Sequence, residues 1–181
     1  YSLYASLRQD ASSIFDAAYN KGTFYGVSAA WDVSNEAFFK QSSLANVIDY
    51  LKIRGGVGTL GNDRISLYTT QALLKTNLSF VTDGGVVIGN IPSGAQSPKN
   101  LTWEKSNTVN IGFDANLLSN RLNIVFDWFK KQSEGVLLNV PIPLTTGING
   151  APAVNAGNID NSGIELSLSY GDIKKDWSYR I

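Results

Sequence analysis

Residues 108–128 read TVNIGFDANLLSNRLNIVFDW, and this stretch decides the fold. Apolar and polar side chains alternate over 108–117, a short polar break follows at 118–121, and the alternation resumes over 122–128. The apolar positions are Val109, Ile111, Phe113, Ala115, Leu117, Leu122, Ile124, Phe126 and Trp128. Because successive side chains of a β-strand point to opposite faces, the pattern predicts an antiparallel hairpin with one apolar and one polar face.

The strands of this hairpin admit two interpretations. Each is close to the ~9–11 residues that a tilted strand needs to cross a bilayer, and the alternation is typical of an outer-membrane barrel with an apolar outside. The same alternation suits a soluble antiparallel sheet with one face in water. Periodicity alone favours the soluble sheet, because such sheets are commoner.

The composition of the 181-residue chain is compatible with both interpretations. Fifteen basic and fifteen acidic residues cancel, so no long-range field would attract nucleic acid. Charged residues make up 17%, which is low against the quarter or so typical of soluble domains. No apolar run is long enough for a transmembrane helix, and no secretory signal is visible. The chain begins and ends inside alternating segments and contains no Met, so we expect a piece of a larger protein.

The absence of His and Cys narrows the possible chemistry. Imidazole and thiolate metal sites, Ser-His-Asp triads and Cys-His pairs are excluded. Paired carboxylates could still serve a glycosidase, but no pair is marked by its spacing. We therefore predict that the chain is not an enzyme and has no catalytic residues, no metal site and no cofactor.

Further alternating segments bring the number of predicted strands to seven. They are 1–8, 23–33, 50–58, 163–170 and 176–181, in addition to the two strands of the first hairpin. Two shorter runs, 78–81 and 86–88, flank Thr82-Asp83-Gly84-Gly85 and predict a small hairpin that turns at Asp-Gly. Ser34 could cap a short helical turn that carries Phe38 and Phe39.

The connections between the strands differ in length in a regular way. Gaps 118–121 and 171–175 are short, whereas 9–22, 59–99 and 132–161 are long. Successive connections in an antiparallel sheet lie at opposite ends, so the long gaps share one end and the short gaps the other; the longer stretch 34–49 is the exception. Short turns at one rim and long loops at the other are the layout of a transmembrane barrel.

Large aromatic residues also favour the barrel, because two aromatic girdles are expected where a barrel crosses the two membrane interfaces. On the expected outward faces, Trp31, Tyr170 and Trp177 lie near the short-turn end, and Tyr25, Trp103 and Trp128 lie near the long-loop end. We therefore predict an all-β fold, an antiparallel transmembrane β-barrel segment of about seven strands. The residues expected to touch lipid are Val109, Ile111, Phe113, Ile124, Phe126, Leu166 and Leu168.

Two other features carry weaker signals. Residues 56–61 fit G-x-G-x-x-G, but a dinucleotide site needs a helix and a βαβ unit, so we interpret these glycines as easing close backbone approach at a strand end. Cationic side chains on the polar face could be solvated, pair with carboxylates or line a lumen. The cations are Arg8, Lys52, Arg54 and Arg180, and the carboxylates are Asp114, Asp127 and Glu165.

Several short segments, each weak alone, occur in an order and spacing typical of one family. They are 7–15 (LRQDASSIF), 22–31 (GTFYGVSAAW), 51–62 (LKIRGGVGTLGN), 101–114 (LTWEKSNTVNIGFD), 120–122 (NRL) and 155–166 (NAGNIDNSGIEL). Together they cover most of the chain apart from 63–99. The chain resembles the C-terminal barrel region of the SusC/RagA-type TonB-linked outer-membrane transporters of Bacteroidota.

This resemblance implies a barrel of about 22 strands with an N-terminal plug. Such a barrel is energised through the TonB complex and imports glycans or peptides with a SusD-like surface lipoprotein as its lid. Residues 1–181 would be part of one β-barrel domain without the plug, and 9–22, 59–99 and 132–161 would be its long outer loops. The expected location is the outer membrane of a Gram-negative bacterium, in contact with outer-membrane lipid and not with nucleic acid.

Two alternatives remain open from the residues. One is a secreted or surface carbohydrate-binding β-sandwich, and the other is part of a glycoside hydrolase with paired carboxylates. Loop 132–161 carries the proline-stiffened apolar run Val140–Leu144, which would pack against neighbouring loops or contact a partner. We expect loops 59–99 and 132–161 to help seat the lipoprotein lid or the ligand.

Overall fold

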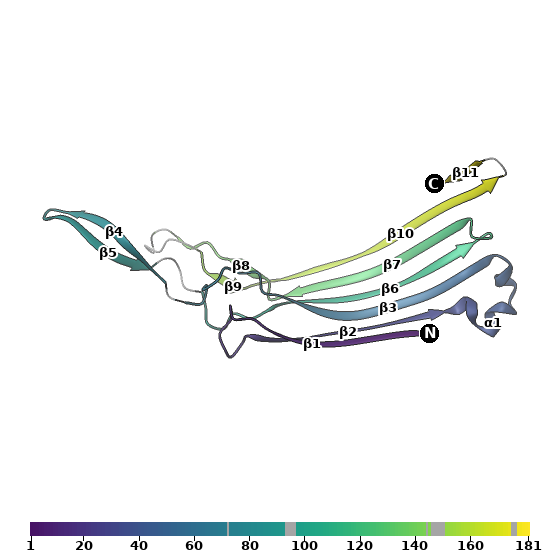
Figure 1. Ribbon diagram of the computed structural model, residues 1–181, viewed down its shortest axis with the longest axis horizontal. Helices are drawn as coiled ribbons and strands as arrows, with labels where there is room; N and C mark the ends of the chain where they lie inside the picture. Colours follow the sequence, from purple (N-terminus) through teal and green to yellow (C-terminus); the bar gives the residue numbers. More distant parts are fainter. Residues whose placement is uncertain (72, 93–96, 144, 146–150, 175–176) are drawn as a thin grey trace.

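The computed structural model describes residues 1–71, 73–92, 97–143, 145, 151–174 and 177–181. Its main element is a long, curved, seven-stranded antiparallel sheet (Figure 1). In sheet order the strands are β1 (Ser2–Ala11), β2 (Lys21–Asp32), β3 (Ile48–Asn62), β6 (Glu104–Leu117), β7 (Leu122–Glu134), β10 (Asn158–Lys174) and β11 (Trp177–Arg180). The sheet is not closed: within the described residues β1 and β11 are its edges.

Two small hairpins lie at the long-loop end of the sheet (Figure 1). The larger consists of β4 (Leu74–Thr82) and β5 (Gly85–Pro92), and the smaller of β8 (Leu137–Asn139) and β9 (Ala153–Asn155). Thr82 pairs with Gly85, so the first hairpin turns at Asp83-Gly84, as the sequence predicts. The β8–β9 pair was not predicted, because three-residue strands are too short to show an alternation.

The strands extend beyond the alternating segments that predict them. β3 continues to Asn62, β7 continues to Glu134 and β10 begins at Asn158, which shortens the predicted loops 59–99 and 132–161. β10 also runs through most of the predicted turn 171–175, so the connection to β11 falls at 175–176, outside the described residues. Hydrophobic alternation ends where one face stops being apolar, whereas backbone pairing continues through polar residues such as those of 130–134.

The connection between β2 and β3 contains short helical segments. They are η1 (Val33–Asn35), α1 (Ala37–Lys40) and η2 (Ser43–Asn46), and they confirm the predicted helical turn around Phe38 and Phe39. The predicted cap is wrong: Ser34 lies inside η1, and Glu36 is the N-cap of α1 without a side-chain capping bond. Glu36 instead accepts a hydrogen bond from the Trp31 indole N–H (3.0 Å), which holds the pKa of this carboxyl below its usual range. None of the helices in the described residues has the length and hydropathy that a membrane-spanning helix needs.

The strand register gathers the apolar side chains on one face of the sheet. Ile53 pairs with Phe113, Phe113 with Phe126, and Phe126 with Leu166, so the four apolar residues form one row across β3, β6, β7 and β10. Ile53 and Leu166 of this row are 42% and 61% exposed, and Phe113 and Phe126 are half-buried. The main sheet therefore leaves its apolar face uncovered within the described residues.

The buried hydrophobic residues gather instead at the long-loop end. This rim cluster consists of Phe15, Phe24, Leu101, Trp103 and Ala153. The Trp103 ring packs against the rings of Phe15 and Phe24, each at 5.5 Å between centroids, and its indole N–H donates to the Asn20 carbonyl (3.2 Å). Trp103 was expected in an outward aromatic girdle, and this is wrong because the loops fold over it and leave 9% of its surface exposed.

The turn between β6 and β7 places three consecutive non-glycine residues in the left-handed region. Leu118, Ser119 and Asn120 have φ values of 58°, 58° and 61°. The turn is held by the Asp49 carboxylate, which accepts from the Asn120 backbone N–H (2.9 Å), and by the Leu118 N–H, which donates to the Val47 carbonyl (3.0 Å). These contacts compensate for a conformation that costs an L-residue roughly 1–2 kcal/mol.

Replacing Ser119 by glycine should therefore stabilise the fold. Glycine removes the left-handed penalty but loses more chain entropy on folding, so we expect a net gain of about 0.5 kcal/mol. Ser119→Val should instead destabilise by about 1 kcal/mol or more, because a β-branched side chain tolerates positive φ poorly. The difference is measured as the denaturant unfolding midpoints of the two variants of the full-length protein. Equal midpoints would contradict the conclusion that the turn is strained at Ser119.

Candidate functional site on the polar face

The polar face of the sheet carries an ion-pair network that joins three strands. Arg54 on β3 donates from both terminal guanidinium nitrogens to the two carboxylate oxygens of Asp127 on β7, each at 2.7 Å. The same guanidinium donates to Asp114 on β6 at 3.2–3.3 Å. We call these three residues the Arg54 clamp. Their side chains are 21–31% exposed, so the clamp is half-buried and is screened less by solvent than a surface pair.

Gly112 makes the Arg54 clamp possible. Arg54, Gly112 and Asp127 are directly paired on neighbouring strands, so Gly112 lies between the charged partners. A Cβ atom at Gly112 would collide with the Asp127 carboxylate and would lie 2.5 Å from the Phe126 carbonyl oxygen. The missing side chain is therefore required for the arginine to reach a carboxylate two strands away.

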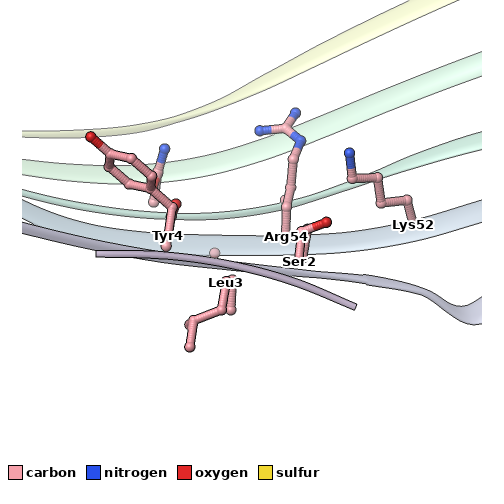
Figure 2. A pocket seen from close by; sticks show the side chains of 11 residues that line it. Ser2, Leu3, Tyr4, Lys52 and Arg54 are labelled. Carbon is pink, nitrogen blue, oxygen red and sulfur yellow. The ribbon is translucent and has the colours of Figure 1, made fainter. Parts of the chain in front are cut away.

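A shallow cleft of about 280 Å³ lies beside the clamp on the same face. Figure 2 shows Tyr4, Lys52 and Arg54 rising from one side of the sheet, whereas Leu3 points to the other. The cleft is also lined by Ser2, Ser28 and Asn110. Its hydroxyl, amide and cationic groups can bind polar ligands, but they form no catalytic arrangement.

The four cationic residues predicted on the polar face differ in their partners. Arg54 pairs with Asp114 and Asp127 as expected, whereas Arg8 pairs with Asp10 (2.8 Å) and lies over the Phe24 ring. Lys52 makes no ion pair in the described part of the chain. Glu165 is exposed beside Asp127, to which it is paired across β10 and β7. The side chain of Arg180 lies outside the described part of the structure. No group of three or more acidic side chains among the described residues is placed to hold a metal ion.

The G-x-G-x-x-G match at 56–61 lies within β3 of an antiparallel sheet, which has neither the helix nor the βαβ unit of a dinucleotide site. Its glycines allow close packing, as expected. A Cβ atom at Gly61 would overlap the Phe24 ring, and one at Gly58 would lie 3.4 Å from the Tyr25 carbonyl oxygen. The Phe24 ring thus covers a strand position that has no side chain of its own.

The asparagine-glycine segment at 155–158 joins the outer loops to each other. Asn155 accepts a hydrogen bond from the Thr102 N–H (2.8 Å) and donates to the carbonyls of Thr102 and Gly135, each at 2.9 Å. Asn158 accepts from the Gly135 N–H (3.3 Å), and Gly157 adopts a φ of +78°. In the sequence, this segment was notable only for its resemblance to the SusC/RagA family. Its role in holding the loops together follows from these contacts.

Two apolar segments of the loops remain exposed. On the β4–β5 hairpin the exposed fractions are 85% for Val81, 67% for Val86 and 70% for Ile88. In the predicted run Val140–Leu144, Val140 is 40% exposed and Ile142 is half-buried, and Leu144 lies outside the described residues. The hairpin, rather than the proline-containing run, therefore offers the larger apolar surface.

Comparison with known protein families gives a match over the whole chain. The family described as TonB dependent receptor-like, beta-barrel matches residues 1–181. TonB-dependent receptor P26 of Formosa agariphila is 33% identical over 173 residues, and TonB-dependent receptor SusC of Bacteroides thetaiotaomicron is 29% identical over 180 residues. These alignments cover 93% and 96% of this chain, but only 16% and 17% of the two relatives.

Solved structures agree with the sequence comparison. The RagAB peptide importer in its closed-closed state has a TM-score of 0.83 and 32% identity, and the open-open state has a TM-score of 0.78 and 32% identity. Each match covers 97% of this chain and 18% of the other chain. The chain thus spans less than a fifth of the length of the proteins that it resembles.

Removing the Arg54 guanidinium should destabilise the full-length protein. Arg54→Gln leaves Asp114 and Asp127 without their cation, and we expect a loss of about 1–3 kcal/mol, between the values for exposed and buried pairs. Arg54→Lys keeps the charge but not the two-pronged geometry, so its loss should be smaller. The unfolding midpoint in denaturant measures both variants.

Arg8→Gln is the matched control for this test, because it also removes a guanidinium from an ion pair. The Arg8 side chain is 60% exposed, so we expect a loss of at most about 1 kcal/mol. A midpoint for Arg54→Gln that equals that of Arg8→Gln would show that the Arg54 clamp contributes no more than a surface ion pair.

Proposed function

Because the chain belongs to the TonB-dependent receptor β-barrel family, we propose that it forms part of the barrel wall and of the outer rim of an energy-driven nutrient importer. The family is not a family of enzymes, and the chain belongs in the outer membrane of a Gram-negative bacterium. The observation that carries the proposal is the match of residues 1–181 to the family together with the TM-score of 0.83 to RagAB. Transport, substrate and partners are proposed for the full-length protein.

The two faces of the sheet support this role. The apolar face would contact lipid, because its row of Ile53, Phe113, Phe126 and Leu166 carries no charge and is not covered within the described residues. The polar face, with the Arg54 clamp and its cleft, would line the lumen. Movement of a substrate through the lumen needs no bond chemistry, which agrees with the absence of His and Cys from the chain.

The proposed substrate is a peptide or a glycan, and the likeness to the RagAB peptide importer supports the peptide. No observation favours the two alternatives, a carbohydrate-binding β-sandwich and part of a glycoside hydrolase. A β-sandwich needs a second sheet of similar size packed on the apolar face, and the described residues contain only one large sheet and two small hairpins.

We further propose that the outer loops contact a SusD-like surface lipoprotein, and that the full-length protein contacts the TonB complex. The surface that supports the first contact is the β4–β5 hairpin. Val81, Val86 and Ile88 share one of its faces, and an isolated two-stranded hairpin with exposed apolar side chains is marginal in water.

The lipid contact is tested by placing a charge on each face of β10. Leu166→Arg on the apolar face should cost about 2–4 kcal/mol of stability in a bilayer, because the charge would lie in hydrocarbon. Ser167→Arg, one residue along the same strand, points to the polar face and should cost far less. Unfolding midpoints of the full-length protein in lipid vesicles measure the difference. Similar losses for the two variants would contradict the assignment of the faces.

The lipoprotein contact is tested with Val81→Ser/Ile88→Ser in the full-length protein, with Ile142→Ser as a parallel variant in the other loop. Two buried apolar side chains contribute about 1.5 kcal/mol each or more, so lipoprotein binding should fall by at least about a hundredfold in the double variant. Lipoprotein co-purification and peptide uptake are measured together, with heat-modifiability as the control for barrel insertion. Unchanged co-purification would exclude the hairpin as the contact.

A further inference from the structure

A second pocket lies on the polar face, nearer the long-loop end than the cleft beside the Arg54 clamp. It has a volume of about 330 Å³, within the range of pockets that bind small molecules, ~300–1,000 Å³. Its lining includes Ser6 and Arg8 on β1, Phe24 on β2, Gly58 and Leu60 on β3, and Thr108 on β6. We call it the Leu60 pocket.

Two paired glycines form the floor of the Leu60 pocket. Gly58 is paired with Gly26 on one side and with Thr108 on the other, so neither β2 nor β3 places a side chain at this point. A Cβ atom would lie 3.0 Å from the Ser6 hydroxyl at Gly26, and 3.4 Å from the Tyr25 carbonyl oxygen at Gly58. The floor is therefore formed by paired backbone, and a ligand need not order it in order to bind.

One wall of the pocket is a cation that is held in place. The Arg8 Nε donates to the Asp10 carboxylate (2.8 Å), and the guanidinium carbon lies 5.8 Å from the centre of the Phe24 ring. The two terminal nitrogens of Arg8 have no hydrogen-bond partner among the described residues. They form a positioned, two-pronged donor, which is the geometry that binds a carboxylate.

The charges around the pocket also favour an anion. Lys131 on β7 is paired directly with Thr108, and it makes no ion pair within the described residues. On β6 the nearest acidic residue of this face is Glu104, four residues from Thr108 and thus about 13 Å along the strand. Arg8 and Lys131 therefore face Asp10 alone at close range, which leaves an excess of positive charge.

The pocket also offers an apolar contact. Leu60 is 61% exposed although it lines a pocket on the polar face, so an apolar group placed against it would remove apolar surface from water. Arg8 and Leu60 lie on strands separated by β2, which places their backbones about 10 Å apart. The C-terminal residue of a peptide carries a carboxylate and a side chain on one Cα atom and can reach both, whereas an internal Asp or Glu supplies only the carboxylate.

We propose that the Leu60 pocket binds the C-terminal residue of a peptide, with its carboxylate at the terminal nitrogens of Arg8 and an apolar side chain against Leu60. The hydroxyls of Ser6 and Thr108 line the same pocket, and each can donate to or accept from the peptide backbone. This inference rests on the proposed import of peptides, and it adds which end of the peptide and which kind of terminal residue the protein selects.

The experiment compares two peptides of one sequence that ends in leucine, one with a free C-terminal carboxylate and one with a C-terminal amide. Both carry a fluorophore at the N-terminus, and fluorescence anisotropy measures their binding to the full-length protein. The free acid should bind about tenfold more tightly, because hydrogen bonds to a charged group contribute that much affinity. Arg8→Gln should weaken the free acid by about tenfold and leave the amide unchanged, whereas a damaged fold would weaken both.

Leu60→Ser tests the apolar contact. It should weaken the peptide that ends in leucine by about tenfold, and it should not weaken a peptide that ends in glycine, which has no side chain to bury. Arg64→Gln and Leu67→Ser are the matched controls, because both residues are exposed and lie outside the pocket. Both controls should bind the free acid as the unchanged protein does.

Three results would overturn the proposal. They are equal binding of the free acid and the amide, equal weakening of both by Arg8→Gln, and an amidated peptide with glutamate in its last position that binds as tightly as the free acid. The last result would assign the pocket to acidic side chains instead of the C-terminus. Peptide binding that does not depend on amidation refutes the pocket alone. Absence of binding for every peptide contradicts the proposed peptide substrate, and the assignment of the pocket with it.

Discussion

The structure depends on one constraint, the pairing of the backbone N–H and C=O groups of each inner strand with the strands on either side. In a layer without water, an unpaired backbone group costs several kcal/mol, so the strands have to pair along their whole length. This pairing fixes the register in which Ile53, Phe113, Phe126 and Leu166 stand in one row. A slip of one residue would turn every side chain of a strand to the other face. The apolar face and the polar face both follow from this register.

Gly112 shows how both faces depend on the same residue. On the polar face its missing side chain lets Arg54 reach Asp127, and on the apolar face its backbone lines a shallow apolar groove between Ile111 and Phe113. The Arg54 clamp also makes the register specific, because a one-residue slip of β6 would bring Ile111 or Phe113 opposite Arg54 and move Asp114 to the apolar face. Half-buried ion pairs contribute modest stability, but leaving a charge without its partner in such a site is costly. The Arg54 clamp therefore destabilises wrong strand registers more than it stabilises the native register.

The sequence predicted the fold because its main determinant, a period of two, is local and repeated on every long strand. It also placed Arg54 on the face of Asp114 and Asp127, since alternation assigns faces without any knowledge of distance. It could not predict the burial of Trp103, which depends on Phe15, Phe24 and Asn20, residues that lie 79 to 88 positions earlier in the chain. Strand ends were misjudged where pairing continues through polar residues, and Ser34 was misassigned because the chain begins a 3-10 turn before the helix. The contact of Arg54 with Asp127 across Gly112 depends on which residues of three strands share a row, and only the register reveals this.

The rim combines a packed part and an exposed part, and the physical difference between them suggests a division of roles. Asn155 joins Thr102 to Gly135, and the rim cluster packs Phe15, Leu101 and Ala153 together, so three loops form one body with its own small core. Such a body keeps its shape because opening any one loop would expose the apolar surface of the others. In the part of the chain that the structure describes, the β4–β5 hairpin forms a two-stranded sheet of its own and contributes no residue to the buried core. A hairpin of this kind gains more from a partner than the packed loops do, because binding covers apolar surface that is otherwise exposed to water. In the proposed contact with a surface lipoprotein, the packed loops would fix the position of the hairpin, and the hairpin would supply most of the binding energy.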